Sequence, residues 1–361
     1  MICSEKICDT ECRLRHRAFW ENSSTGVPLV YAVSDKPGFT QAPWKSSLPR
    51  KEWDLLPDWH LNQIDNFLEG TCFFGDAMPM ASLMVGLDIT NTAVLAGGDY
   101  DYSSTGHFID FKAGSFDLEQ PVPNFTPDHP LAVSLKHCYE TIIPHVRDRA
   151  FVNTPMTLDA LSSLYGLRGS RTFLLDLVQN KDLVKQRVKE MTAAYLAFYD
   201  YFYDFLVQNG YGESGSWYQV LCEGKFESVR CDFSVMLSQE MFCEFVVPEL
   251  IQVCDHTNHS LFNMCSVRHA RFIYDLAAIS SLDGIFWNPE PYLEGIRDYL
   301  PELEKIKNQG MLLEIVCHRV EDAVLAARSL GPNGLYLLFE PRFSSPDQAL
   351  HAIDRVYNAC R

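Results

Sequence analysis

The sequence predicts an α/β protein that forms a (β/α)8 TIM barrel, and three observations lead to this prediction. From residue 150 onward, short apolar segments alternate with amphipathic helices, a pattern typical of parallel strands. About eight strands are expected over the chain, as many as such a barrel contains. The chain has no glycine-rich dinucleotide fingerprint, no Walker loop and no GxSxG motif, which favours a barrel over a doubly wound sheet.

The first part of the chain is the less regular one. Residues 36–57 are rich in Pro, Trp and Ser and are expected to form an irregular excursion. Residues 91–130 carry many Gly, Asp, Ser and Pro residues, which predicts loops and small strands. We therefore expect one domain over residues 1–361, with an N-terminal extension at 1–60 and a loop-rich insertion at about 91–130.

Apolar runs place the strands, and periodicity near 3.6 residues places the helices. The expected strands lie at 27–33, 150–153, 211–219, 229–233, 260–264, 284–287, 312–316 and 335–339. The expected helices lie at 9–24, 59–68, 157–164, 171–176, 183–207, 239–255, 269–278, 291–299, 320–329 and 346–358. Ser238 and Ser345 stand just before two of these helices, where a serine caps the first turn.

Composition and charge narrow the classes of partner. The chain is 47% hydrophobic and 21% charged, which is ordinary for a globular protein with a substantial core. Its net charge of −17 argues against nucleic acid and anionic membranes as partners. No apolar run reaches the length of a membrane span, and the start of the chain lacks the apolar core of a secretory signal. We expect a cytoplasmic protein and leave a homodimer open.

The twelve cysteines favour reduced thiols rather than disulfides. They are scattered, and several, such as Cys222 and Cys254, lie in apolar runs. Cys3, Cys8 and Cys12 cluster without a later CxxC partner, so a zinc knuckle is not expected there.

Polar or aromatic residues at or near the carboxyl ends of strands are the candidates for a functional site, because ligands bind at the carboxyl ends of barrel strands. These candidates are Asp76, Trp217, Tyr218, Asp232, Ser234, Asn263, Cys265, Trp287, Asn288, Glu314, Cys317, His318, Glu340 and Arg342. Each has a simpler alternative: Asp76 and Asp232 could cap a helix or a turn, and Cys265 could be a small buried apolar residue. Glu314 lies in the apolar segment LLEIV. Its carboxyl group is expected to contact a polar group inside the barrel or a ligand, because an unpaired buried charge is costly.

Four of these candidates have the residue types of a zinc site. Cys265, Cys317, Glu314 and Glu340 would supply thiolate and carboxylate ligands. A zinc ion with an exchangeable position would lower the pKa of a bound thiol and create a nucleophile for methyl transfer. The ligands would come from separate strands, so their spacing in the sequence is not diagnostic.

The chain resembles the uroporphyrinogen decarboxylase superfamily, which includes the cobamide-dependent methyltransferases. Four stretches carry the resemblance over about residues 60–360: CFFGDAMPMASLMVG, TPMTLDALSSLYGLRGSRTFLLDLVQNKDLV, CDFSVMLSQEMFCEFVVPEL, and SLFNMCS followed by LDGIFWNP. The resemblance implies a (β/α)8 barrel whose site lies at the carboxyl ends of the strands.

The departures from the family pattern bear on the substrate and on the metal. Residues 25–60 contain nothing like the decarboxylases' arginine-rich motif, which argues against uroporphyrinogen itself, although Asp76 matches their pyrrole-binding aspartate. Cys265 matches the zinc cysteine of the methyltransferases, but Asn263 replaces their zinc histidine. Phe339 stands where the families carry histidine or cysteine, so a metal site would have to include Glu340 or Glu314.

We therefore expect a methyltransferase-like enzyme that moves a methyl group between a small substrate and a corrinoid protein or a thiol. Asp76 and Asp232 would orient the substrate. The expected substrate contacts are Trp217, Tyr218, Ser234, Asn263, Trp287 and Asn288, with the aromatic side chains as an apolar wall. Two alternatives stay open: a cofactor-free decarboxylase of a porphyrinogen-like tetrapyrrole that uses Asp76, and a non-catalytic barrel that binds a small molecule.

Overall fold

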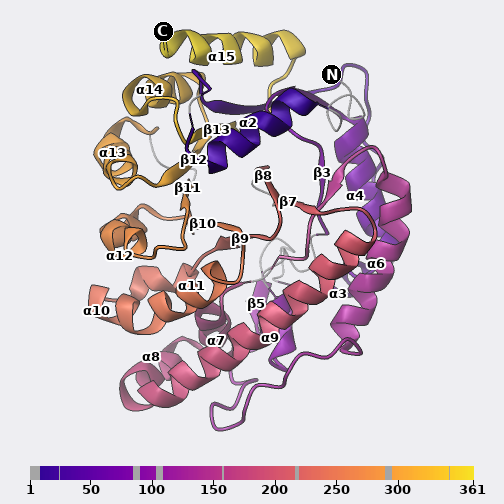
Figure 1. Cartoon of the computed structure of the whole chain (residues 1–361). Helices are drawn as coiled ribbons and strands as arrows, with labels where there is room; N and C mark the ends of the chain where they lie inside the picture. The colour runs from indigo at the N-terminus through magenta and orange to yellow at the C-terminus, as the bar shows by residue number, and fades with distance from the viewer. Residues whose placement is uncertain are drawn as a thin grey trace.

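A large, mostly parallel sheet organises the chain (Figure 1). The computed structural model describes residues 9–23, 25–83, 90–102, 109–156, 158–215, 219–288, 295–340 and 342–361. The sheet has seven strands in the order β2-β1-β13-β12-β11-β10-β9. The pair β1·β2 is antiparallel, and the other neighbours are parallel. The strands are β1 (Leu29–Asp35), β2 (Thr71–Gly75), β9 (Phe226–Val229), β10 (His259–Met264), β11 (Gly284–Trp287), β12 (Leu312–Cys317) and β13 (Leu335–Phe339).

Three two-stranded sheets accompany the large one. Strands β3 (Met80–Ala81) and β6 (Phe151–Val152) pair in parallel. The antiparallel pairs are β4 (Tyr100–Tyr102) with β5 (Ile109–Phe111), and β7 (Glu213–Gly215) with β8 (Leu221–Glu223). Strand pairing within the described residues does not join β3·β6 to the large sheet, so these residues form a mixed α/β fold without a hydrogen-bonded closed barrel.

Helices flank the strands in chain order. Figure 1 shows α11, α12, α13 and α14 one after another along one side of the strands, with α4 and α6 on the opposite side. The first helices are α2 (Thr10–Trp20), α3 (Arg50–Trp53), α4 (Pro57–Glu69), α5 (Asn91–Leu95), α6 (Pro130–Val146), α7 (Ala160–Arg168) and α8 (Ser170–Gln179). The later ones are α9 (Lys181–Gln208), α10 (Gln239–Met241), α11 (Val247–Cys254), α12 (Ile273–Ala277), α13 (Leu300–Asn308), α14 (Val320–Leu330) and α15 (Pro346–Ala359). Every helix among the described residues is too short or too polar to span a bilayer.

Both faces of the sheet are buried, as is usual when helices cover parallel strands. Successive side chains alternate between the faces. One face, here called the inner face, carries Leu29, Tyr31, Val33, Leu261, Phe286, Leu312, Val316, Tyr336 and Leu338, which share one core with β3, β6 and α6. The other face, here called the outer face, carries Val30, Phe262, Ile285, Trp287, Leu313, Ile315, Cys317, Leu337 and Phe339, which pack with residues of α11 to α15.

Helix α2 covers the amino ends of the parallel strands. Trp20 stacks on the ring of His259, the first residue of β10, and its indole N–H donates to the Leu221 carbonyl at 2.8 Å. His16 and Phe19 make edge contacts with the ring of Tyr336, near the start of β13. Helix α2 therefore covers this end of the inner core, beside an open hollow of about 630 Å³ lined by residues of α2, β7, β8 and His259, while the carboxyl ends of the strands lie at the opposite end.

Several predicted elements are confirmed, and others end elsewhere. The strands at 260–264, 284–287, 312–316 and 335–339 agree with β10 to β13 within one residue. The strand predicted at 229–233 ends at Val229, because Asp232–Met236 forms a 3₁₀ turn. Of the helix predicted at 291–299, residues 291–294 lie outside the described residues, while α13 at Leu300–Asn308 was not predicted.

Candidate functional site

The parallel register arranges the inner-face side chains in rows across the sheet. In the lower row, Asn263, Phe286, Glu314 and Tyr336 are register partners on β10, β11, β12 and β13. In the upper row, two residues further along, Val316 pairs with Leu338 and Leu338 pairs with Tyr31. The same register continued past the strand ends puts Asn288, Cys265 and Asp232 in the upper row. The Asn288 N–H donates to the Met264 carbonyl at 3.3 Å, which supports this continuation.

A cavity of about 240 Å³, here called the mouth pocket, opens at the carboxyl ends of β1, β11, β12 and β13. It is lined by Tyr31, Val33, Phe67, Gln219, Phe286, Asn288, Val316, Leu338, Phe339, Glu340 and Arg342. Apolar and aromatic walls with a few polar side chains at the rim are typical of small-molecule sites. The structure therefore brings three of the predicted candidates, Asn288, Glu340 and Arg342, to one pocket.

Two charged residues lie at the rim of the mouth pocket, the acidic Glu340 and the cationic Arg342. The Glu340 N–H donates to the Cys317 carbonyl at 3.0 Å, which fixes the turn that follows β13. Arg342 donates to the carbonyl of Gly70 at 3.0 Å and lies 3.3 Å from the Asp35 carboxylate. Burial raises the pKa of Tyr31 well above its ordinary value, with Arg342 lowering it and Glu340 raising it, so Tyr31 offers a neutral phenol.

Asp232 and Cys265 meet where β9 and β10 end. The Cys265 Sγ–H donates to Asp232 Oδ1 at 3.6 Å. Burial, and then the Asp232 carboxylate, raise the pKa of Cys265 to about 12. Cys265 is therefore a thiol at neutral pH and not a thiolate nucleophile.

The lower row holds a carboxyl group that has no hydrogen-bond partner in the described part of the chain. Glu314 has 0% exposed surface, and neither of its carboxyl oxygens has a partner among the described residues. Burial raises the pKa of Glu314 well above its ordinary value, so the group is protonated at neutral pH. Asn263, 4% exposed, likewise has a side-chain oxygen without a partner in the described part of the chain.

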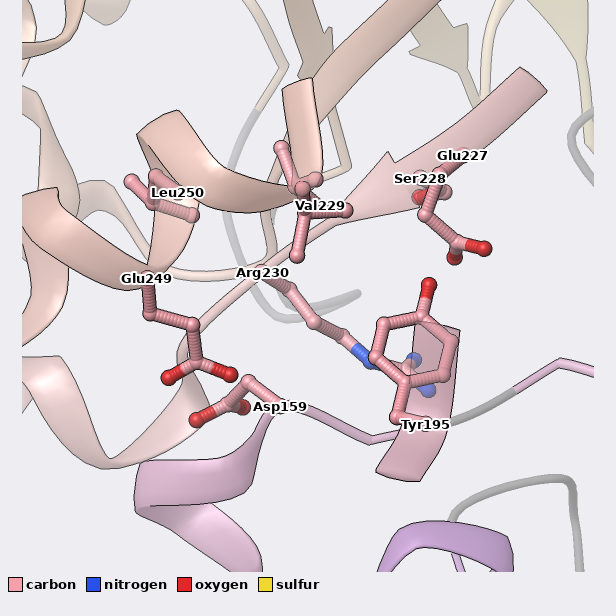
Figure 2. A pocket seen from close by; sticks show the side chains of 9 residues that line it. Asp159, Tyr195, Glu227, Ser228, Val229, Arg230, Glu249 and Leu250 are labelled. Atoms are coloured by element: carbon pink, nitrogen blue, oxygen red, sulfur yellow. The ribbon is translucent and has the colours of Figure 1, made fainter. Parts of the chain in front are cut away.

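A second group of acids lies behind β9, around a water-sized cavity of about 20 Å³ (Figure 2). The carboxylate of Asp159 caps α7 by accepting from the Ser162 N–H at 2.7 Å, and Glu249 accepts from the Ala160 N–H at 2.6 Å. Burial raises the pKa of both acids, and repulsion from the Asp159 carboxylate adds to the raised pKa of Glu249. Figure 2 shows Glu227 facing the Tyr195 hydroxyl, and burial raises the pKa of Glu227 to about 7.

The acids behind β9 are connected to the strand-end site by the turn after β9, which carries Asp232. Repulsion from Asp232 contributes to the raised pKa of Asp159, and Ser162 accepts from the Phe233 N–H at 3.1 Å. The start of α7 thus holds the turn that carries Asp232. Sequence reasoning did not assign Asp159, Glu227 and Glu249 to a site, because no pattern in the sequence shows that α7, α11 and β9 meet.

Other predicted site residues lie away from the mouth pocket. Ser234 is fully buried and donates to the Cys231 carbonyl at 2.6 Å. Trp287 and Cys317 sit on the outer face, where Trp287 packs against Tyr299 and Cys317 lies in the helix-side core. The expectation that these two side chains face the site is wrong, because they occupy the alternate positions of β11 and β12. Trp217 and Tyr218 lie outside the described residues.

Asp76 lies at the opposite edge of the sheet. It follows β2, which runs antiparallel to β1, so this strand ends where β1 begins. Gly75, at φ +59°, makes the turn, and its missing side chain lets the chain pass close to the Val30 carbonyl. Arg15 binds both oxygens of the Asp76 carboxylate, at 2.6 and 3.0 Å, and the Val30 N–H donates to it at 2.8 Å. The predicted place of Asp76 among the strand ends of the site is therefore wrong.

The four predicted zinc ligands do not converge. Glu314 is an inner residue of the lower row, Cys317 lies on the outer face, and Glu340 lies at the exposed rim. The Cys317 thiol donates to the Ile315 carbonyl at 3.7 Å. Over the residues that the structure describes, no three side chains of His, Cys, Asp or Glu are grouped so that they could hold a metal ion. The predicted four-residue ligand set does not fit zinc.

Comparison with known proteins identifies the fold. No protein-family model matches the chain, and no curated protein sequence matches it significantly. Among solved structures, the chain is similar to a methyltransferase from Methanosarcina mazei, with a TM-score of 0.60 and 14% sequence identity. The match covers 97% of this chain and 98% of the methyltransferase chain. The two proteins therefore share a fold over nearly their whole lengths.

Proposed function

We propose that this chain is a methyltransferase-like enzyme that holds a small organic substrate in the mouth pocket. The observation that carries the proposal is the position of the pocket, at the carboxyl ends of parallel strands in a fold shared with a methyltransferase. We also propose that β3 and β6 complete a (β/α)8 barrel of the uroporphyrinogen decarboxylase superfamily. Parallel pairing of β3 with β6 supports this, because six strands of the large sheet are also parallel to one another.

In the proposed reaction, Asp232 is the general base. A methyl acceptor with an N–H or S–H group would lie near Asp232 and transfer its proton to the carboxylate as the bond to the methyl carbon forms. The bond between the methyl group and its donor breaks in the same step, and the donor leaves with the electron pair. Cys265 donates a hydrogen bond to Asp232 and so positions it.

The methyl donor is proposed to be a corrinoid protein or a methylated thiol. The aromatic walls of the pocket, which include Phe67, Phe286 and Phe339, suit a methyl-bearing group. No step is routed through zinc, because the predicted ligands do not converge. The alternative of porphyrinogen decarboxylation loses its key residue, since Asp76 is ion-paired with Arg15 at the far edge of the sheet.

A methyl-transfer assay tests the proposal. The purified protein would be incubated with methylcobalamin as donor and with small thiols and amines as acceptors, and methylated products would be identified by mass spectrometry. The wild type should form a methylated product, and D232N should slow its formation by about a hundredfold or more. E304Q, which also converts a carboxylate to an amide but at an exposed acid of α13, should leave the rate unchanged. The absence of methyl transfer from every donor tested would contradict the proposed function and leave a binding role.

A further inference from the structure

One layer beneath the lining of the mouth pocket lie two oxygen-bearing side chains, Asn263 and Glu314, that have no hydrogen-bond partner for these oxygens among the described residues. Phe286 lines the pocket, and its register partners in the lower row are Asn263 and Glu314. Val316, which also lines the pocket, is the next inner residue above Glu314 on the same strand. Inner residues two positions apart on a strand are about 6.5 Å apart. Glu314 and Asn263 thus form a polar layer beneath the residues that line the pocket, and the same register continued past β9 places the buried Arg230 beside Asn263.

This polar layer holds three side-chain oxygens without a hydrogen-bond partner among the described residues. Both carboxyl oxygens of Glu314 and the side-chain oxygen of Asn263 are buried and unpaired among the described residues. Tyr336, the neighbour of Glu314 on β13, already donates its hydroxyl hydrogen to the Gln219 carbonyl at 3.1 Å. A buried polar group without a partner is destabilising, so such groups call for a ligand or another specific explanation.

We infer that the mouth pocket recognises a small organic amine, whose ammonium group enters the polar layer and binds Glu314 and Asn263. The inference rests on the proposed function for the position of the pocket and adds to it an ammonium group on the substrate, separate from the N–H or S–H group that would accept the methyl group near Asp232. An ammonium offers several N–H donors to acceptors that lack them, whereas an alcohol offers one. The aromatic rings around the pocket add favourable contacts with the cation.

Binding of the ammonium would release a proton. Glu314 is protonated in the empty pocket, so the ion pair forms as its carboxyl hydrogen leaves to solvent. Of the two side chains that flank Glu314 in the lower row, Phe286 does not titrate, and Tyr336 stays neutral because burial raises its pKa far above the ordinary value. The released proton therefore comes from Glu314 when a preformed ammonium binds.

The test compares isobutylamine with its isostere isobutanol, using ligand-observed NMR and calorimetry without any methyl donor. Wild-type protein should bind the amine about tenfold more tightly or better, and calorimetry in buffers of different ionisation enthalpy should show about one proton released. E314Q should lose this preference and the proton release, while its affinity for isobutanol stays unchanged. E304Q on α13, the same change at an exposed acid, should behave as wild type.

Equal affinity for amine and alcohol in the wild type, no binding of either, or an amine preference that survives in E314Q would each overturn the inference. Because no donor is present, the result is independent of turnover. Amine binding without methyl transfer would contradict only the proposed function, and methyl transfer without amine preference would contradict only this inference.

Discussion

The thiol of Cys265 and the carboxylate of Asp232 face each other across two neighbouring strand ends, with Sγ 3.6 Å from Oδ1. Each residue follows a strand of the large sheet, Cys265 after β10 and Asp232 after β9. The pair is thus positioned by backbone register, and its chemistry leads to the first prediction.

Cys265 should react slowly with alkylating reagents near neutral pH. Burial and the Asp232 carboxylate both disfavour its thiolate. D232N removes one of these causes, so the Cys265 alkylation rate at a given pH should rise, while burial keeps it below that of a free thiol. Iodoacetamide labelling followed by peptide mass spectrometry measures this rate residue by residue. Rapid labelling of Cys265 in the wild type at neutral pH would show that the thiolate is stabilised.

Asp76 should matter for stability through its ion pair with Arg15. The Asp76 side chain is 2% exposed and that of Arg15 is 15% exposed, so D76N leaves a mostly buried guanidinium without its counter-charge. The expected loss in unfolding free energy is about 3 kcal/mol. Denaturant unfolding measures it, with E223Q as control, because the pair Arg17–Glu223 is exposed and its loss should leave the unfolding free energy nearly unchanged. Unchanged stability in D76N would refute the structural role.

The acid Glu227 should make stability fall as pH rises. Its pKa is about 7 in the folded chain and about 4.3 when unfolded, so the unfolded state loses its proton first. The contribution of Glu227 to the unfolding free energy is complete below the pKa of the unfolded state. It is lost as pH rises toward the pKa of the folded state, by up to about 1.4 kcal/mol per pH unit.

The Glu227 effect is measured by denaturant unfolding across this pH range. E227Q should flatten the curve, because glutamine cannot ionise. Asp159 and Glu249 have raised pKa values as well, so a residual slope of the same sign should persist in E227Q. A curve with the same slope in E227Q as in the wild type would mean that Glu227 keeps an ordinary pKa.

Cys317 should be dispensable at the mouth pocket. It lies on the outer face, so C317A is expected to cost about 1 kcal/mol of stability through lost packing and to leave ligand affinity unchanged. Calorimetry with isobutylamine and denaturant unfolding measure the two effects. Treatment with a zinc chelator should likewise leave amine affinity unchanged. A loss of affinity after either change would restore the zinc site that the sequence suggested.

The sequence predicted the strands well where apolar runs were short and bounded. Strands β10 to β13 appeared within one residue of the predicted ranges, and Asn288 and Glu340 reached a common pocket. The direction in which strand side chains point was harder to predict. Strands β11 and β12 are buried on both faces, so GIFW and LLEIVC lack the apolar–polar alternation that would show that Trp287 and Cys317 face the helices.

The direction of a strand was the second feature that the sequence did not predict. The run CFFGD resembles the end of a barrel strand, but β2 runs antiparallel to β1, and this reverses the edge to which Asp76 belongs. Nothing local in that stretch specifies the direction, because a parallel and an antiparallel strand have the same side-chain period. The acids behind β9 were out of reach for a related reason, since their meeting depends on how α7 and α11 pack.

Helix α2 has a consequence for the order of events in a catalytic cycle. It is fastened across the amino ends of the strands by Trp20 and by ion pairs of Arg13 with Glu213 and of Arg17 with Glu223. In the proposed reaction, a small substrate and a bulky methyl donor would therefore both approach the mouth pocket from the carboxyl ends of the strands, where the pocket opens. This arrangement predicts ordered binding. The small substrate would bind first, the donor would then dock over it, and the product would dissociate only after the donor has dissociated. Kinetics should show compulsory ordering, with excess donor inhibiting turnover by blocking the entrance.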